Sequence, residues 1–299
     1  MIASTLSVAR HQPSSAGVVV ITDVDGVLRH ADSRSLAEAR PALDMLASGG
    51  SPVVLCSDNS AAELLWLQRE LGLRHPFICE GGAALYIPGG YFCDCIDLGL
   101  TGGDWEVIEF GPPRQEVHAA LERAAASLQL PLLTISDMSV QDIVAEWGMS
   151  FHEAQLAKQR QYTELFRVLE VGERAATRLF TAMRGVGFRC VTGLRFHQAT
   201  GVTSPAHAVR LLISLYRACG DAPPIIGIGG DWRHRSLLRE VDSAIVVRSE
   251  GVDQTRLLRK VPTAYLTDAC GPAGWTEAIL GHCSVGTGSR RVGEIASSN

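Results

Sequence analysis

The stretch VVVITDVDGVLRH, Val18 to His30, decides the fold that the sequence predicts. A run of apolar, mostly β-branched residues ends in Asp23 and Asp25, which flank one valine and precede Gly26. A short Val/Ile run that ends in Asp-Gly is typical of a buried strand terminating at a turn. In open α/β sheets, ligands bind at the carboxyl ends of the strands. We therefore expect both carboxylates to lie at a ligand-binding edge.

Three further segments share this pattern: 51–58 (SPVVLCSD), 223–231 (PPIIGIGGD) and 242–247 (DSAIVV). Continuous hydrophobicity suits parallel strands that are covered on both faces. Helical patterns lie between them, one over 35–50 that closes with a Gly pair and one over 60–73 that opens with Ser60 as a cap. The alternation predicts an α/β fold with a doubly wound, mostly parallel, Rossmann-like core sheet.

The strand pattern disappears between residues 88 and 201. The segments 113–130 (PRQEVHAALERAAASLQL) and 151–166 (FHEAQLAKQRQYTELF) have helical patterns instead. Since core strands resume afterwards, we expect an inserted α+β cap domain. The predicted division is a flexible tail over 1–16, a core over 17–87 and 202–285, a cap over 88–201, and a flexible tail over 286–299.

Composition narrows the class of ligand. The chain has 299 residues, of which 46% are hydrophobic, and a net charge of −5, which offers no electrostatic footprint for nucleic acid or an anionic membrane. We expect a small-molecule partner.

The N-terminal segment lacks the apolar core of a signal peptide, and no run approaches the roughly 18 apolar residues of a membrane span. A cytoplasmic protein is predicted, and the sequence does not indicate its oligomeric state.

The eight cysteines are scattered and contain no Cys-x-x-Cys pair, so zinc-site spacing is absent. Most of them are predicted to be small buried hydrophobic residues. The alternative for Cys93 and Cys95 is a redox pair.

Two carboxylates at the tip of a strand suit phosphoryl transfer. One attacks phosphorus to give an aspartyl phosphate and the other protonates the leaving oxygen. The alternative is an Asp-Gly turn with two solvated acids. Two residues at the ends of other predicted strands favour phosphoryl transfer over this alternative. Ser57 can hydrogen-bond phosphoryl oxygens, and Asp231 supplies the carboxylate oxygen that Mg²⁺ prefers. The GIGG segment before Asp231 is a weak match to a dinucleotide loop, because it lacks the full glycine spacing.

The order TDVDGVL, VVLCS, an insert and then GIGGD resembles the haloacid dehalogenase superfamily with its larger cap. One branch, the mannosyl-3-phosphoglycerate phosphatases, is similar over about residues 18–280. The stretches that carry this similarity are AAELLWLQRELGL, HPFICEGGAALYIPGGYF, IVAEWGMSFHEAQLAKQRQYTELF, GLRFHQATG and GPAGWTEAIL.

The resemblance implies a hydrolase that uses Asp23 as nucleophile and Asp25 as acid/base, with Ser57 contacting the phosphoryl group. It implies Mg²⁺ bound by Asp23, the backbone carbonyl of Asp25, and Asp231. The substrate is expected to be a phosphorylated sugar or glycosyl-glycerate. The residues expected to bind it are Asn59, Glu80, Gly81, Gly82, Arg160, Arg195, His207 and Arg235. The alternatives are a surface-helix charge for Arg160 and a strand-end charge for Arg195.

The chain departs from the family pattern at the predicted site. The lysine of the second motif is absent from Ser57-Asp58-Asn59-Ser60, and Pro205-Ala206 replaces the Lys-Gly that opens a later helix. The Gly-Asp-x-x-Asn-Asp metal motif reads Gly230-Asp231-Trp232-Arg233-His234-Arg235. Ser204 and Pro205 still form a good helix start that can bind phosphate.

Because Arg235 replaces an acid, we expect Mg²⁺ binding to be weakened or lost. Arg233, Arg235 or His207 can supply the missing positive charge, and His234 is interpreted as a loop histidine, with a softer-metal ligand as the alternative. Two function hypotheses follow. The first is a phosphatase that uses Asp23 and Asp25. The second is a catalytically impaired or repurposed family member that binds an anionic, sugar-like ligand; a scaffold without any ligand is the poorest alternative.

Overall fold

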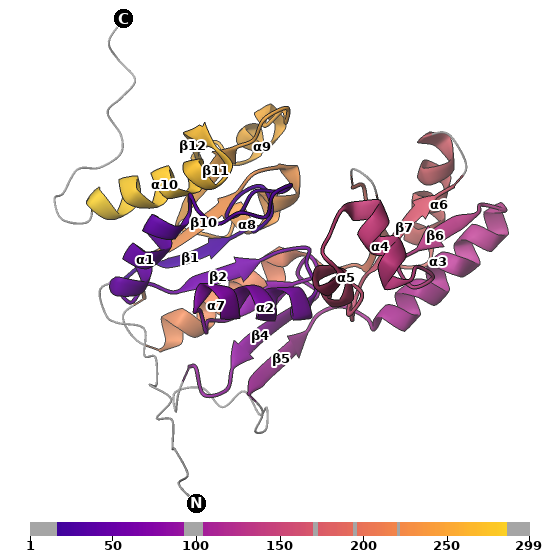
Figure 1. Ribbon diagram of the computed structural model, residues 1–299, viewed down its shortest axis with the longest axis horizontal. Coiled ribbons are helices and arrows are strands. Elements are labelled where there is room, and N and C mark those ends of the chain that lie inside the picture. Colours follow the sequence, from indigo (N-terminus) through magenta and orange to yellow (C-terminus); the bar gives the residue numbers. More distant parts are fainter. Residues whose placement is uncertain (1–16, 93–103, 170–172, 194–195, 220–221, 286–299) are drawn as a thin grey trace, which may run out of the picture. The chain divides into compact units, whose positions relative to one another are not determined.

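The computed structural model describes residues 17–92, 104–169, 173–193, 196–219 and 222–285 (Figure 1). Two compact units are present. Within the described residues, unit 1 lies between Val54 and Pro223, and unit 2 comprises residues 17–53 and 224–285. The two predicted tails, the pair Cys93 and Cys95, and Arg195 lie outside the described residues.

Unit 2 is built on parallel strands in the order β12-β11-β10-β1. The strands are β1 (Val19–Thr22), β10 (Ile225–Gly229), β11 (Ser243–Arg248) and β12 (Tyr265–Cys270). All four residues of β1 and all five of β10 are buried, as expected for runs of apolar residues covered on both faces.

The helical elements of unit 2 are α1 (Arg40–Ser48), the 3₁₀ turn η2 (Trp232–His234), α8 (Arg235–Leu238), α9 (Thr255–Lys260) and α10 (Gly271–Val285). Helix α10 packs on β11 and β12 and against α1, while α8 packs on β10 and β11. The fully buried Trp275 of α10 donates its indole N–H to Thr22 Oγ1 at 3.0 Å, which ties the helix to the end of β1.

The core part of unit 1 holds strands β2 (Val53–Cys56, from Val54 onward), β3 (Phe77–Cys79), β4 (Ala84–Pro88) and β5 (Trp105–Glu109). The β2–β3 pair is parallel, and β3–β4 and β4–β5 are antiparallel. Helices α2 (Ala61–Leu71) and α7 (Pro205–Ala218) contact β3.

The remainder of unit 1 is an antiparallel sheet with its own helices (Figure 1). Its strands, in the order β6-β7-β9-β8, are β6 (Leu132–Thr134), β7 (Glu164–Val168), β9 (His197–Gly201) and β8 (Phe188–Val191). Its helices are α3 (Arg114–Leu128), α4 (Val140–Trp147), α5 (Phe151–Ala157) and α6 (Glu173–Gly185). Leu121, Phe166, Leu179 and Met183 belong to one buried cluster there, which gives this sheet a core of its own.

The predicted fold class is confirmed: the chain is α/β, with mostly parallel core strands and an α+β cap. The helix predicted over 151–166 is wrong in its second half, because α5 ends at Ala157 and β7 begins at Glu164. Strand β5 falls inside the range predicted for the cap yet pairs with β4. We still propose a cap domain over residues 88–201. In this proposal β5 belongs to the insertion in sequence, but it adds a strand to the core by pairing with β4.

No helix in the described ranges combines the length and apolar character needed to cross a membrane.

Candidate active site

Asp23 follows directly on β1. Its backbone N–H donates to Ile228 O of the neighbouring strand at 3.0 Å, which extends the pairing of β1 and β10 up to the carboxylate. Only 6% of the residue is exposed. The next turn holds Asp25, whose Oδ1 accepts from Arg29 Nε at 2.7 Å. Arg29 is itself buried, so both acids are held in fixed positions at the end of β1.

Asp231 stands at the corresponding end of β10 and caps η2. Its Oδ1 accepts the Arg233 backbone N–H at 2.8 Å. The Arg233 side chain donates to Asp231 Oδ2 from Nε at 3.0 Å and from Nη2 at 2.7 Å. An arginine of the same loop therefore holds the carboxylate predicted to bind a metal.

His234 bridges the two strand ends. Its Nε2 lies 3.2 Å from Asp23 Oδ2, and its Nδ1 lies 3.5 Å from Asp231 Oδ1. The backbone N–H groups of Gly230 and Asp231 also donate to Nδ1, at 3.1 and 3.2 Å. Sequence reasoning missed this residue, which it treated as a loop histidine. Its place at the Asn position of the metal motif was the available signal.

The charges of this cluster are coupled. Burial lowers the pKa of His234, but the carboxylates of Asp23 and Asp231 raise it, and the net shift is upward. Burial raises the pKa of Asp231, but His234 and Arg233 lower it, and the net shift is downward. The two amide donors make Nδ1 an acceptor, which assigns the proton of the neutral ring to Nε2, facing Asp23.

In unit 1, Ser57 follows directly on β2 and is 7% exposed. Its backbone N–H donates to Ile78 O at 3.0 Å, and its Oγ accepts the backbone N–H of Asn59 at 3.3 Å. Asn59 O in turn accepts the Glu80 N–H at 3.0 Å. The loops that follow β2 and β3 are thus bonded to each other, and they bring together three of the predicted site residues.

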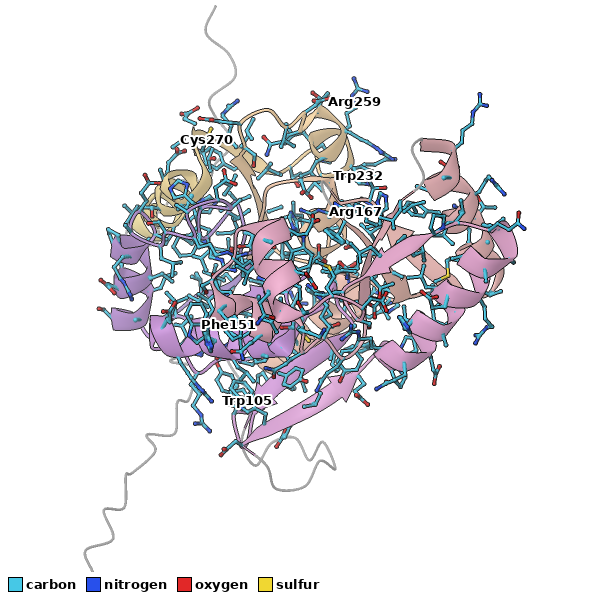
Figure 2. The ribbon with its side chains drawn as sticks, turned by 45° about the vertical axis from the view of Figure 1, so that its right-hand side comes forward. Trp105, Phe151, Arg167, Trp232, Arg259 and Cys270 are labelled. Atoms are coloured by element: carbon cyan, nitrogen blue, oxygen red, sulfur yellow. The ribbon has the colours of Figure 1, made fainter. Side chains whose placement is uncertain are left out.

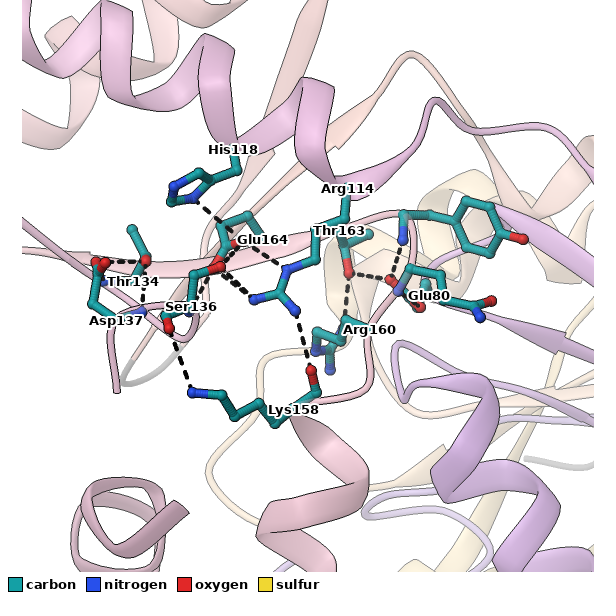
Figure 3. Close-up of polar contacts among 12 residues, drawn as sticks. Glu80, Arg114, His118, Thr134, Ser136, Asp137, Lys158, Arg160, Thr163 and Glu164 are labelled. Atoms are coloured by element: carbon teal, nitrogen blue, oxygen red, sulfur yellow. Dashed lines mark hydrogen bonds and ion pairs between the residues drawn. The ribbon is translucent and has the colours of Figure 1, made fainter. Parts of the chain in front are cut away.

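Glu80 fastens the loop after β3 to the segment that enters β7 (Figure 3). Its carboxylate accepts from the backbone N–H groups of Gln161 at 2.8 Å and Tyr162 at 3.0 Å, and from Thr163 Oγ1 at 2.6 Å. Only 1% of Glu80 is exposed. Both carboxylate oxygens are therefore used within the protein, a role that the sequence did not predict.

Arg160 lies beside Glu80 (Figure 3). It donates from Nη1 to Asp58 O and to Thr163 Oγ1, both at 2.9 Å. It is 8% exposed, so the alternative of a surface-helix charge is wrong. Its buried Nε has no hydrogen-bond partner within the part of the chain that the structure describes.

Gly81 and Gly82 complete this loop with positive φ angles of 68° and 91°. A Cβ built on Gly82 would lie 2.4 Å from Pro205 N, so this glycine lets the loop approach the start of α7. Ser204 caps that helix as predicted. His207 is exposed in its first turn.

Comparison of the chain with known proteins identifies its family. No family model matches the chain. It is 30% identical over 264 residues to the glucosyl-3-phosphoglycerate/mannosyl-3-phosphoglycerate phosphatase of Methanococcoides burtonii, covering 88% of this chain and 96% of that protein. The chain belongs to the glucosyl-3-phosphoglycerate/mannosyl-3-phosphoglycerate phosphatase family.

A second member of this phosphatase family, from Persephonella marina, is 27% identical over 269 residues, which cover 88% of this chain and 96% of that protein. Among solved structures, a haloacid dehalogenase-like hydrolase from Bacteroides thetaiotaomicron matches with a TM-score of 0.60 at 15% identity, over 89% of this chain and 99% of that one. The predicted resemblance is therefore confirmed.

The metal expected for a phosphatase of this family does not fit the arrangement of these residues. Mg²⁺ takes near-octahedral oxygen ligation at short distance. Here Asp23 Oδ2 faces the His234 ring, and both oxygens of Asp231 face N–H groups of Arg233. Within the described ranges, no group of three or more His, Cys, Asp or Glu side chains is placed to hold a metal ion.

Arg235, at the last acidic position of the family motif, interacts with an aromatic ring. Its guanidinium carbon lies 4.5 Å from the centre of the Trp232 ring, and its Nη1 donates to Trp232 O at 3.1 Å. Arg256 lies over the same ring at 3.8 Å. Trp232 is labelled in Figure 2.

Proposed function

We propose that the protein is a phosphatase that removes the phosphate from a phosphorylated sugar or glycosyl-glycerate, with glucosyl- and mannosyl-3-phosphoglycerate as its substrate class. One observation carries the proposal. Asp23, the nucleophile that the family pattern implies, stands buried and oriented at the carboxyl end of β1. The chain that carries it spans 96% of the length of its curated phosphatase relative.

The reaction proceeds in two displacements at phosphorus. Asp23 Oδ1 attacks, because Oδ2 is held by His234, and an Asp–O–P bond forms as the P–O bond to the substrate alcohol breaks, which in the 3-phosphoglycerate esters is the bond to the glycerate 3-oxygen. The leaving oxygen takes a proton from Asp25. Water then attacks the phosphoaspartate and gives a proton to Asp25. This second step releases inorganic phosphate and restores both acids.

The remaining site residues are assigned to binding. Ser57 contacts the phosphoryl group, and its hydroxyl is oriented by the Asn59 N–H. Asn59, Gly81 and Gly82, together with Arg195, His207 and Arg235, are assigned to the sugar and glycerate parts. For Glu80 and Arg160 we assign positioning of this loop, since their side chains bond to Thr163 and its neighbours. Phosphatases of this fold generally use Mg²⁺, and we propose that Mg²⁺ binding is weakened or lost here.

The test measures phosphate released from mannosyl- and glucosyl-3-phosphoglycerate. Asp23→Asn lowers the rate by about three orders of magnitude or more, because the amide cannot attack phosphorus. Asp44→Asn, at an exposed position of α1, is the matched control and leaves the rate unchanged. With labelled substrate, the wild type forms a hydroxylamine-sensitive phosphoprotein and Asp23→Asn does not.

Full activity in Asp23→Asn would refute the aspartyl-phosphate route. If the wild type releases no phosphate from either ester, the proposed function is wrong, and the catalytically impaired family member becomes the better interpretation.

A further inference from the structure

The region between Asp23 and Asp231 is filled by one side chain. The His234 ring places Nε2 against Asp23 and Nδ1 against Asp231. These are the two carboxylates that the family pattern assigns to a metal ion. The ring is well buried, with 13% of the side chain exposed.

The backbone around the ring is shaped to hold it there. Two consecutive N–H groups, from Gly230 and Asp231, point at Nδ1. A Cβ built on Gly229 would lie 2.5 Å from His234 Cβ and 2.8 Å from Cγ, so the ring packs where a side chain at Gly229 would be. Removing the ring from this place would leave those N–H groups without their acceptor.

We propose that the imidazole of His234 takes the place of the metal ion between Asp23 and Asp231, so that the wild-type protein does not take up Mg²⁺ there. Arg233 reinforces the exclusion, because it engages both oxygens of Asp231. The proposal deepens the proposed function, in which the same Asp23 is the nucleophile.

The experiment measures binding of Mn²⁺, a probe for the Mg²⁺ position, by electron paramagnetic resonance in the absence of substrate. Two variants test the roles of the two ring nitrogen atoms of His234 separately. In His234→Asn, the side-chain oxygen can accept the backbone N–H groups as Nδ1 does, but the side chain is too short to reach Asp23. In His234→Gln, the terminal amide reaches as far as Nε2 and still covers Asp23.

We expect the wild type and His234→Gln to leave Mn²⁺ free, and His234→Asn to bind it at least about tenfold more tightly. His152→Asn, a histidine of α5 in unit 1, is the matched control and behaves as the wild type. Adding Asp231→Asn to His234→Asn should abolish the increase in Mn²⁺ affinity. Mn²⁺ binding by the wild type as tight as by His234→Asn overturns the proposal, and so does a His234→Asn variant that binds no better than the wild type.

A second measurement separates this inference from the proposed function. Phosphate release by the wild type is assayed with and without EDTA. Release that is insensitive to EDTA supports the inference. If EDTA abolishes phosphate release, the inference is overturned, but the phosphatase assignment stays in place. If no phosphate is released in any buffer, the proposed function is overturned, and the Mn²⁺ measurement alone decides the inference.

Discussion

Glu80 combines an unfavourable backbone with an extensively bonded side chain. Its φ of 48° lies in the left-handed region, which costs a non-glycine residue roughly 1–2 kcal/mol. The carboxylate offsets this cost through its bonds to Gln161, Tyr162 and Thr163. The residue therefore fixes the path of the chain into β7, the strand that starts at Glu164.

Replacing Glu80 by Gln tests this role at the scale of the residue. Only one of the two terminal atoms of Gln can accept, so at least one buried N–H or hydroxyl group loses its partner. We expect the free energy of unfolding, measured in urea, to fall by about 2 kcal/mol. Glu70→Gln, at the exposed end of α2, is the control and should change stability by less than about 0.5 kcal/mol. Equal stability of the two variants would contradict the role.

At the scale of the element, helices α2 and α4 begin with the same capping box in different surroundings. Ser60 of α2 is fully buried, and besides capping Glu63 N it donates from Oγ to Leu156 O at 2.9 Å. Ser139 of α4 caps Asp142 N in an exposed position. The first cap therefore also bonds α2 to the end of α5, whereas the bonds of Ser139 to other described residues stay within its own helix.

We expect Ser60→Ala to lower the free energy of unfolding by about 2 kcal/mol and Ser139→Ala by about 1 kcal/mol, because only the first also removes a buried hydrogen bond to another helix, from Ser60 Oγ to Leu156 O. Urea denaturation of the two variants is the measurement. A Ser139→Ala cost equal to or above that of Ser60→Ala would show that the bond to Leu156 adds nothing.

The contact between β12 and α10 gives an element-scale pH dependence. Glu277 of α10 accepts from Tyr265 Oη at 2.7 Å, Asp268 N at 3.1 Å and Ala269 N at 2.8 Å. Burial raises the pKa of Glu277, but these hydrogen bonds lower it more, and the net shift is downward. A folded-state pKa below the unfolded value of about 4.3 gives stability that is present above this pH and lost as the pH falls through the folded value.

Glu277→Gln should therefore flatten the fall in stability below about pH 4.3. Urea unfolding at a series of pH values measures it, and the exposed Glu250→Gln serves as the control. An acid slope identical to that of the wild type would mean that Glu277 gains nothing from these bonds.

At the scale of the whole molecule, the core strands were predictable because their signal is local. Continuous Val/Ile runs such as 18–21 are sufficient for buried parallel strands. The start of β7 was not predictable in this way. Residues 158–163 continue a sequence compatible with a helix, and they turn away because Glu80 binds that segment from a distant position and Arg160 of the segment donates to Asp58 O. Tertiary contacts override helix propensity there.

In the candidate site, too, residues with a local sequence signal were predictable, and contacts between distant segments were not. Asp23 and Asp231 were predicted because each closes a strand run, and strand ends converge. The position of His234 depends on the pairing of β1 with β10, which brings Asp23 within reach of a ring from the later loop. Arg235 was expected to serve an anion, and its stacking on Trp232 could not be read from sequence spacing.

The stacking of Arg235 and Arg256 on Trp232 also has an optical consequence. Indole fluorescence is sensitive to charges held close to the ring, and here both guanidinium carbons lie within 4.5 Å of the ring centre. Trp232 adjoins Asp231 in the chain, so any rearrangement of the loop that carries His234 alters the surroundings of this chromophore. The other four of the five tryptophans in the chain lie outside this loop. The loop thus contains a built-in spectroscopic probe, which reports on the carboxylate beside it without an added label.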